Sequence, residues 1–159
     1  LLMTYIIPDI SNYQVTGTVE SSFQDLTTSF SEVIGSKINY NPESGLSKVC
    51  YEFTTSYAWV SAASNKVDFK LLSGSSAGSL SDVGDGYFCT IGRGVNARSE
   101  NIINIKFILD SWTGNKILAL HARDNDSTDP ANLHGFQRSD RSETDIYFSP
   151  TVSCYSYKG

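Results

Sequence analysis

The chain has 159 residues and a mass of 17.4 kDa, the size of one domain, and its 24 Ser, 12 Thr, 12 Gly and 9 Tyr favour strands with one solvent-facing side over helices. Its 12 Lys and Arg against 17 Asp and Glu give a formal net charge of −5, which disfavours nucleic-acid partners. The longest apolar runs are far shorter than the ~20 residues that span a bilayer, so we expect a soluble protein with no membrane partner.

The amino-terminal third is predicted to contain short strands followed by one long strand. The chain begins Leu1-Leu2-Met3, as the interior of a longer polypeptide would, and we interpret residues 1–15 as an arm or linker. Strand patterns follow at 14–20 and 37–40. From residue 49 to 59 the odd positions read Val, Tyr, Phe, Thr, Tyr, Trp and the even positions Cys, Glu, Thr, Ser, Ala. This period of two predicts a long strand whose aromatic face fills a core, with a sugar-stacking surface as the alternative.

The middle of the chain continues the same pattern. Residues 67–71 alternate strictly, 74–79 form a polar loop, 82–86 have the composition of a turn, and 87–91 form a short strand. A hairpin follows, with strands at 103–109 and 116–123 around a turn at 110–115.

The carboxy-terminal part combines a long polar stretch with a final strand. Residues 124–143 lack periodicity, and loops of this length are typically functional. Residues 145–157 alternate again, interrupted at Pro150. No ten-residue stretch has helical periodicity. The prediction is an all-β chain, a single antiparallel β-sandwich with the jelly-roll arrangement of about eight strands over residues 1–159.

The cysteines do not form a recognisable metal or redox motif. Cys50, Cys89 and Cys154 stand far apart without a C-x-x-C pair. We expect them to be small buried hydrophobes, with one disulfide as the alternative.

Candidate catalytic and metal-binding residues are few. His121 lies in a predicted strand and His134 in the late polar stretch, and for both we favour a structural hydrogen bond over acid–base work. The acidic run at 124–129 offers Asp124, Asp126 and Asp129 as weak candidates for a cation, but Gly and Glu are missing at the positions that an EF-hand requires. We therefore predict a solvated turn, no metal, no cofactor and no enzymatic activity.

Several segments together resemble jelly-roll domains of virion proteins, the tail-fibre, head-fibre and knob-like modules of tailed phages, notably marine phages, with relatives in algal viruses. The similar segments are residues 34–49, where a short strand leads through Asn41-Pro42-Glu43-Ser44 into Ser47-Lys48-Val49, then 69–72, 105–114 and Leu133-His134-Gly135. The resemblance implies a TNF-like jelly roll, usually a homotrimer, displayed on a virion and without shared catalytic residues.

Three functions follow, in order of preference. The first is a non-enzymatic structural or attachment protein of a virus particle, a homotrimer that contacts other virion proteins or a host surface glycan, located in the virion. The second is an extracellular carbohydrate-binding module or lectin of cellular origin, and the third a jelly-roll glycoside hydrolase or lyase, for which no carboxylate pair can be placed. Binding is expected in loops 73–86 and 124–143, and the candidate binding residues are Asp124, Asn125, Asp126, His134, Arg138 and Asp140. In a trimer, Tyr155 and Tyr157 are candidates for the contact between subunits.

Overall fold

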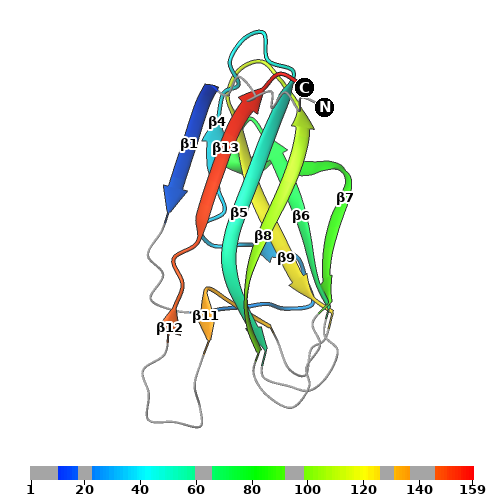
Figure 1. Cartoon of the computed structure of the whole chain (residues 1–159). Coiled ribbons are helices and arrows are strands. Elements are labelled where there is room, and N and C mark those ends of the chain that lie inside the picture. The colour runs from blue at the N-terminus through cyan, green and yellow to red at the C-terminus, as the bar shows by residue number, and fades with distance from the viewer. Residues whose placement is uncertain (1–10, 18–22, 60–65, 92–98, 126–130, 137–145) are drawn as a thin grey trace, which may run out of the picture.

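The computed structural model describes residues 11–17, 23–59, 66–91, 99–125, 131–136 and 146–159, and these form two antiparallel sheets packed face to face (Figure 1). The prediction of an all-β sandwich is confirmed. Among the described residues the first sheet contains β1 (Ser11–Gly17), β13 (Thr151–Tyr157), β5 (Lys48–Trp59) and β8 (Ser99–Asp110), with the short strands β2 (Gln24–Asp25) and β10 (Asn132–Leu133). The second contains β3 (Ser31–Glu32), β4 (Ile38–Tyr40), β9 (Lys116–Asp124), β6 (Lys66–Gly74) and β7 (Ser81–Ile91).

The pairing of the eight described strands that have three or more residues is nested. β1 pairs with β13, β4 with β9, β5 with β8, and β6 with β7. The first strand of the chain therefore pairs with the last, and each further pair lies, in sequence, between the two strands of the pair before it. Additional pairings of β5 with β13 and of β6 with β9 join these ribbons into the two sheets. A small ribbon of β11 (Gly135–Phe136) and β12 (Ile146–Tyr147) lies beside the lower end of the sandwich in Figure 1.

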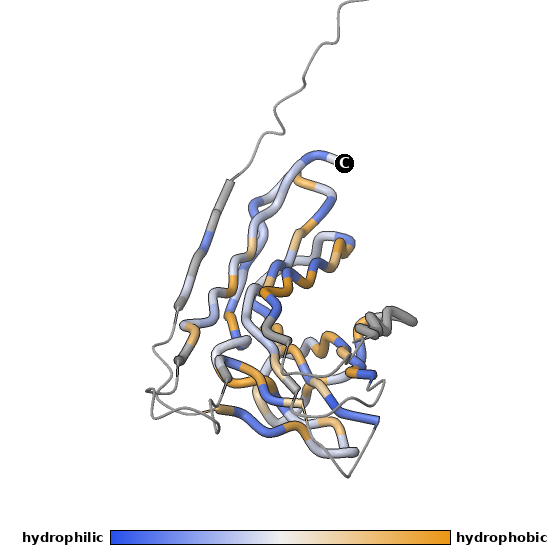
Figure 2. The backbone as a smooth tube through the Cα atoms, turned by 60° about the horizontal axis from the view of Figure 1, so that its bottom comes forward, coloured by the Kyte–Doolittle hydropathy of each residue, from blue (hydrophilic) through white to orange (hydrophobic). Residues whose placement is uncertain are grey.

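Alternation along the strands places the core between the two sheets. On β5, the odd residues from Val49 to Tyr57 are at most 7% exposed and face residues such as Phe69 and Leu120 of the second sheet. The expected aromatic face is therefore core and not a sugar-stacking surface. Figure 2 shows hydrophobic and hydrophilic positions alternating along the traced strands. On β8 the same rule buries Ile105 and leaves Ile102 and Ile108 exposed.

Three expected boundaries differ in the structure. The stretch 124–143, predicted to be a loop, contains the short strands β10 and β11. Residues 11–15, interpreted as part of an arm, lie in β1 and pair with β13. Residues 82–86, predicted to be a turn, belong to β7. The register between β6 and β7 jumps from Lys70 opposite Tyr87 to Leu72 opposite Asp82, so residues 83–86 form a bulge in the strand. Glycine inside a strand permits such a bulge as well as a turn, and the sequence alone does not distinguish the two.

The other expected features agree with the structure. The turn between β8 and β9 contains Gly114 at φ 82°, and Pro150 separates β12 from β13. The described residues contain only one helical segment, the three-residue 3₁₀ turn η1 (Ala77–Ser79). Within them, no helix has the length and apolar character needed to cross a membrane.

Candidate functional site

The structure places two of the predicted binding residues inside the protein. Asp124 and His134 are both fully buried, so neither side chain can reach a ligand at the surface, and the solvated turn predicted at 124–129 does not include Asp124. Asn125 is exposed and donates from Nδ2 to Asp68 Oδ2 at 3.1 Å, beside the ion pair between Arg123 and Asp68. Four further candidates, Asp126, Asp129, Arg138 and Asp140, lie outside the described residues.

His134 connects three segments at the lower end of the sandwich. Its Nδ1 lies 2.9 Å from Thr55 Oγ1 on β5, and its Nε2 lies 3.2 Å from Gln24 Oε1 on β2. Gln24 Oε1 also accepts the backbone N–H of Ile34, so it is an acceptor and His134 Nε2 carries the hydrogen. The Nδ1 atom is paired with Thr55 Oγ1, which also lies 3.3 Å from Ser56 O. The predicted structural hydrogen bond is therefore present on both ring nitrogens of His134. The same prediction is wrong for Nε2 of His121, which is buried without a hydrogen-bond partner among the described residues.

Asp124 closes the base of a loop. Its Oδ2 accepts the backbone N–H of Ala131 at 2.6 Å, and its own N–H donates to Thr27 O at 2.8 Å. These bonds hold together the end of β9 and the beginning of β10. Among the described residues, no group of three or more His, Cys, Asp or Glu side chains is arranged to hold a metal ion.

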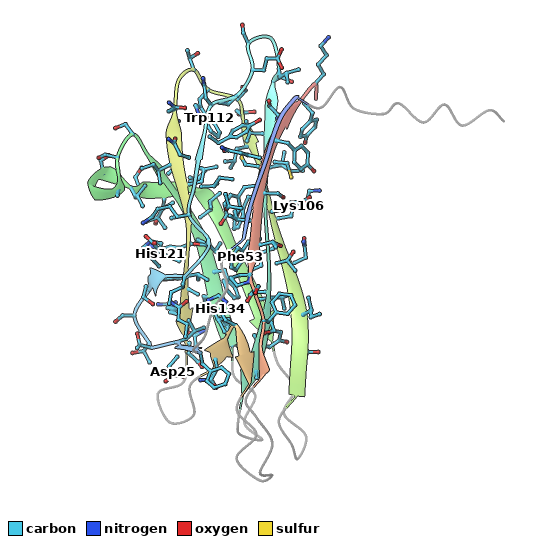
Figure 3. All side chains as sticks on the ribbon, turned by 90° about the vertical axis from the view of Figure 1, so that its left-hand side faces the viewer. Asp25, Phe53, Lys106, Trp112, His121 and His134 are labelled. Carbon is cyan, nitrogen blue, oxygen red and sulfur yellow. The ribbon has the colours of Figure 1, made fainter. Side chains whose placement is uncertain are left out.

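A concave feature of the described surface lies at the opposite end, between the β4–β5 loop and the β8–β9 turn. We call this the end pocket. It has a volume of about 670 Å³ and is lined by residues 41–46 and 111–114. Figure 3 labels Trp112 at this end, while His134 and Asp25 lie toward the other.

The two walls of the end pocket are joined at their base. Ser111 donates its backbone N–H to Ser47 O at 2.9 Å, and Lys48 forms an ion pair with Asp110 at 2.6 Å. The backbone N–H of Glu43 donates to Ser156 Oγ, which also accepts from Tyr40. These contacts fix both loops to the end of the first sheet, so the pocket is held open by the scaffold.

Trp112 separates the end pocket from the core. The indole is half-buried, packs against the core cluster and meets Tyr40 edge-on with ring centroids 6.3 Å apart. Lys116 Nζ lies 5.1 Å from its ring centroid. Its buried Nε1 has no hydrogen-bond partner among the described residues. A buried donor without a partner costs about 1–3 kcal/mol.

The second notable surface is the outer face of the first sheet. Across the strands, Tyr155 of β13, Cys50 of β5 and Ile108 of β8 form one row, and Ser153, Glu52 and Lys106 form the next. Ile102 and Ile108 are 68% and 57% exposed on this face.

Charges on this outer face are organised around Glu52. Its Oε1 lies 2.6 Å from Lys106 Nζ and accepts the Tyr155 hydroxyl at 3.2 Å. The hydrogen bond from Lys106 lowers the pKa of Glu52 and in turn raises the pKa of Lys106. Burial raises the pKa of Tyr155. Lys106 projects away from the core residue Phe53 in Figure 3, as alternation requires.

The cysteines on β5 and β13 are buried and free, as expected. Cys154 pairs in register with Tyr51, and Cys50 with Tyr155, so the two thiols lie on opposite faces of the sheet. Burial raises the pKa of Cys154 to about 12. Both behave as small hydrophobic side chains rather than as a reactive pair.

Sequence reasoning missed the end pocket. It identified the turn at 110–115 and the Asn41-Pro42-Glu43-Ser44 segment, but nothing in the linear pattern indicates that they adjoin. The available signal was a tryptophan in a turn, where an aromatic side chain is uncommon.

Comparisons with known proteins do not assign an activity. No protein-family model matches the chain, and no curated protein matches it. Solved structures similar to it include the crystal structure of dimeric latent PorU from Porphyromonas gingivalis, with a TM-score of 0.47 and 10% sequence identity, over 91% of this chain and 13% of that one. The chain thus spans about an eighth of the length of PorU.

Proposed function

We propose that this chain is a non-enzymatic structural or attachment protein of a virus particle, built on a jelly roll and acting by surface contact. The observation that carries the proposal is the nested order of its eight longer strands. Numbered along the chain, they lie in the order 1-8-3-6 in one sheet and 2-7-4-5 in the other. A ribbon of the pairs 1·8, 2·7, 3·6 and 4·5 wrapped into two sheets is the arrangement that a jelly roll requires.

The segments that resemble virion jelly rolls support the same proposal. Residues 34–49 form β4, the following loop and the start of β5, while residues 105–114 form the end of β8 and its turn. These two segments come together around the end pocket. Fold alone does not define function, so the proposal also depends on surfaces suited to contact.

The outer face of the first sheet supports association between copies. Two exposed isoleucines flank a polar centre formed by Glu52 and Lys106, and the half-buried Tyr155 and Tyr157 stack beside it with ring centroids 6.2 Å apart. Tyrosine and exposed aliphatic side chains around satisfied polar groups are typical of subunit interfaces. We propose that this face forms the contact in a homotrimer.

Light scattering coupled to size-exclusion chromatography tests this proposal. We expect the mass of three chains for the wild type. The double variant Ile102→Lys/Ile108→Lys should give the mass of one chain with an unchanged melting temperature, because both side chains are exposed. Ile34→Lys is the matched control, since Ile34 is 42% exposed in the turn between β3 and β4 of the second sheet, and its change should leave the trimer intact.

Two outcomes would contradict the proposal. A wild-type chain that stays monomeric at all concentrations would exclude the proposed homotrimer. Release of reducing sugar from polysaccharides that a single Asp or Glu substitution abolishes would show that the protein is an enzyme and not a structural protein.

A second candidate function is a carbohydrate-binding module of cellular origin. The observation in its favour is the end pocket, which combines an indole with hydroxyl, amide and carboxylate side chains. Such a module would work as a monomer, so the mass measurement separates the two candidates.

A further inference from the structure

We infer that the open edge of β8 pairs with the same edge of a second copy of this chain, as antiparallel strands related by a two-fold axis. We call this pairing the β8 seam. β8 spans 12 residues and, among the described residues, pairs only with β5; in Figure 1 it lies on the other side of β5 from β13. The inference goes beyond the proposed function, because a two-fold contact closes with two copies and cannot by itself build a trimer.

The other described strands at the sheet edges are protected against such pairing, whereas β8 is not. β2, β3 and β4 have only two or three residues, and the registers of β1 and β7 shift against their partners. Short strands and bulges are features by which natural sheets block edge pairing. β8 keeps an unbroken register with β5 from Ser99 to Asp110 and contains no proline. Within residues 101–109 its single charged side chain, Lys106, is paired with Glu52, so the edge is long, regular and open to a partner strand.

The hydrogen-bonding groups at this edge belong to the even residues of β8. Ser56 of β5 accepts the His134 N–H on the side where β10 pairs, and Ser47 accepts the Ser111 N–H on the side of β8. Because backbone groups alternate in direction along a strand, the odd residues of β5 bond toward β8, and they lie opposite the odd residues of β8. The backbone N–H and C=O groups that point out of the edge are therefore those of residues 102, 104, 106 and 108.

One register of the two edges fits the exposed side chains. Centred on Ile105, it places Ile102 of each copy opposite Ile108 of the other, and Asn104 opposite Lys106. These isoleucines are 68% and 57% exposed in the single chain, and each gains an apolar neighbour across the seam. The opposed residues are all even, so their free backbone groups face one another and can form hydrogen-bonded pairs.

Neighbouring registers fit less well. A shift by one residue would place the core side of one β8 opposite the outer side of the other, so only shifts by two need comparison. Centred on Lys106, the pairing would bring the two Lys106 side chains directly opposite each other, where like charges repel. Centred on Asn104, it would place each Ile102 opposite Lys106. Charge and apolar contact therefore both select the register centred on Ile105.

The core side of β8 matches in the same register. Ile103, Phe107 and Leu109 pack against the core but are only half-buried, whereas Ile105 is 1% exposed. In the register centred on Ile105, Ile103 of one copy lies opposite Phe107 of the other. The seam therefore joins the two cores at their open sides. A strand added at the edge leaves the outer face of the first sheet uncovered, so the proposed trimer contact stays available.

Light scattering of the full chain over a series of concentrations tests the inference. We expect the mass of three chains in dilute protein and a rise toward six as the concentration increases, because each seam joins two chains from different trimers. Residue-resolved amide hydrogen exchange gives the second measurement. Exchange at residues 102, 104, 106 and 108 should slow as the mass rises, while the odd residues of β8, already bonded to β5, should not change.

Asn104→Pro separates the seam from the fold. It removes an N–H that the seam uses and the single chain does not, and proline is tolerated at a sheet edge where its nitrogen faces outward. We expect this variant to stay at three chains at every concentration. Asn104→Thr is the matched control, because it loses the same side-chain bond to Thr54 but keeps the N–H, and its mass should rise like that of the wild type.

Two further variants at this position test the register without changing the backbone. Asn104→Lys places a like charge opposite Lys106 of the second copy and should weaken the association of trimers about tenfold, since the contact occurs twice in each seam. Asn104→Glu places an opposite charge there and should strengthen the association by a similar factor. This comparison decides the matter if the proline variant fails to fold.

Failure of the seam is distinguishable from failure of the proposed function. A trimer whose mass does not change with concentration, or equal association of Asn104→Lys and Asn104→Glu, overturns the seam and leaves the homotrimer intact. Species of two chains and none of three, dissociated by Asn104→Pro, would support the seam and overturn the homotrimer. A chain that stays monomeric at all concentrations overturns both.

Discussion

His134 shows how a single buried side chain organises one end of this protein. The residue adopts φ 70°, a conformation that few non-glycine residues occupy, and its backbone N–H and carbonyl bond to Ser56 and Phe148. The ring then links Thr55 of β5 to Gln24 of β2. The strained backbone is held by four hydrogen bonds from different segments, which gives the histidine at this position a structural role.

The hydrogen bond between Thr55 and His134 can be measured by a substitution that keeps shape. Thr55→Val leaves Nδ1 of a buried imidazole without its hydrogen-bond partner and should lower the free energy of unfolding by about 1–3 kcal/mol. Thr54→Val, one position away, loses a solvent-exposed bond from Asn104 and should cost less than about 0.5 kcal/mol. Urea unfolding of both variants measures the two free energies. Equal losses of unfolding free energy would show that the buried hydrogen bond stabilises the protein no more than the exposed one does.

At the scale of the elements, β8 has two faces of opposite character. Ile105 is 1% exposed and packs in the core opposite Phe53, while Ile102 is 68% exposed on the outer face. Among the described residues β8 pairs only with β5, so it is an edge strand of the first sheet. The face of this strand on which a residue lies therefore decides whether its side chain packs in the core or stays exposed.

The same substitution on the two faces of β8 should give different results. Ile105→Ala removes buried volume and should destabilise the protein by about 2–4 kcal/mol. Ile102→Ala should change the stability of a single subunit by less than about 0.5 kcal/mol. Urea unfolding in dilute protein, where light scattering gives one chain, measures both values. A large loss at Ile102 in the isolated subunit would mean that this face is covered within one chain.

At the scale of the whole molecule, stability depends on pH through groups on the outer sheet faces. His121 lies on the outer face of the second sheet, beside Glu32 and Lys70 in register, and burial lowers its pKa below the ordinary value of 6.5. The unfolded chain then takes up a proton at a higher pH than the folded chain does. Stability is therefore lost as the pH falls through 6.5.

The expected result is a loss of unfolding free energy between pH 7.5 and pH 5 that is smaller in the His121→Gln variant. Glu52 does not change the stability in this pH range. Its pKa is lowered in the folded protein, so its contribution to the free energy of unfolding is lost only as the pH falls below its ordinary value of 4.5. Urea unfolding at a series of pH values provides the measurement. Parallel curves for the wild type and the variant would contradict the assignment to His121.

The sequence by itself determined the secondary structure and which side of most strands is buried. Alternation at Val49, Tyr51 and Phe53 reports burial directly, since neighbouring strand residues point to opposite faces. The turn at Gly114 was likewise visible, because glycine after a hydrophobic run readily adopts the left-handed backbone that a tight turn requires.

Only the tertiary structure decided the register, the burial of polar groups and the pocket. Asp124 is a charged residue at the end of a strand, and its burial depends on the backbone N–H of Ala131 that a loop brings back to it. The bulge at residues 83–86 depends on where β6 pairs, and the end pocket on two loops that are far apart in sequence. Periodicity records which way a side chain points, whereas these features depend on which distant segment it meets.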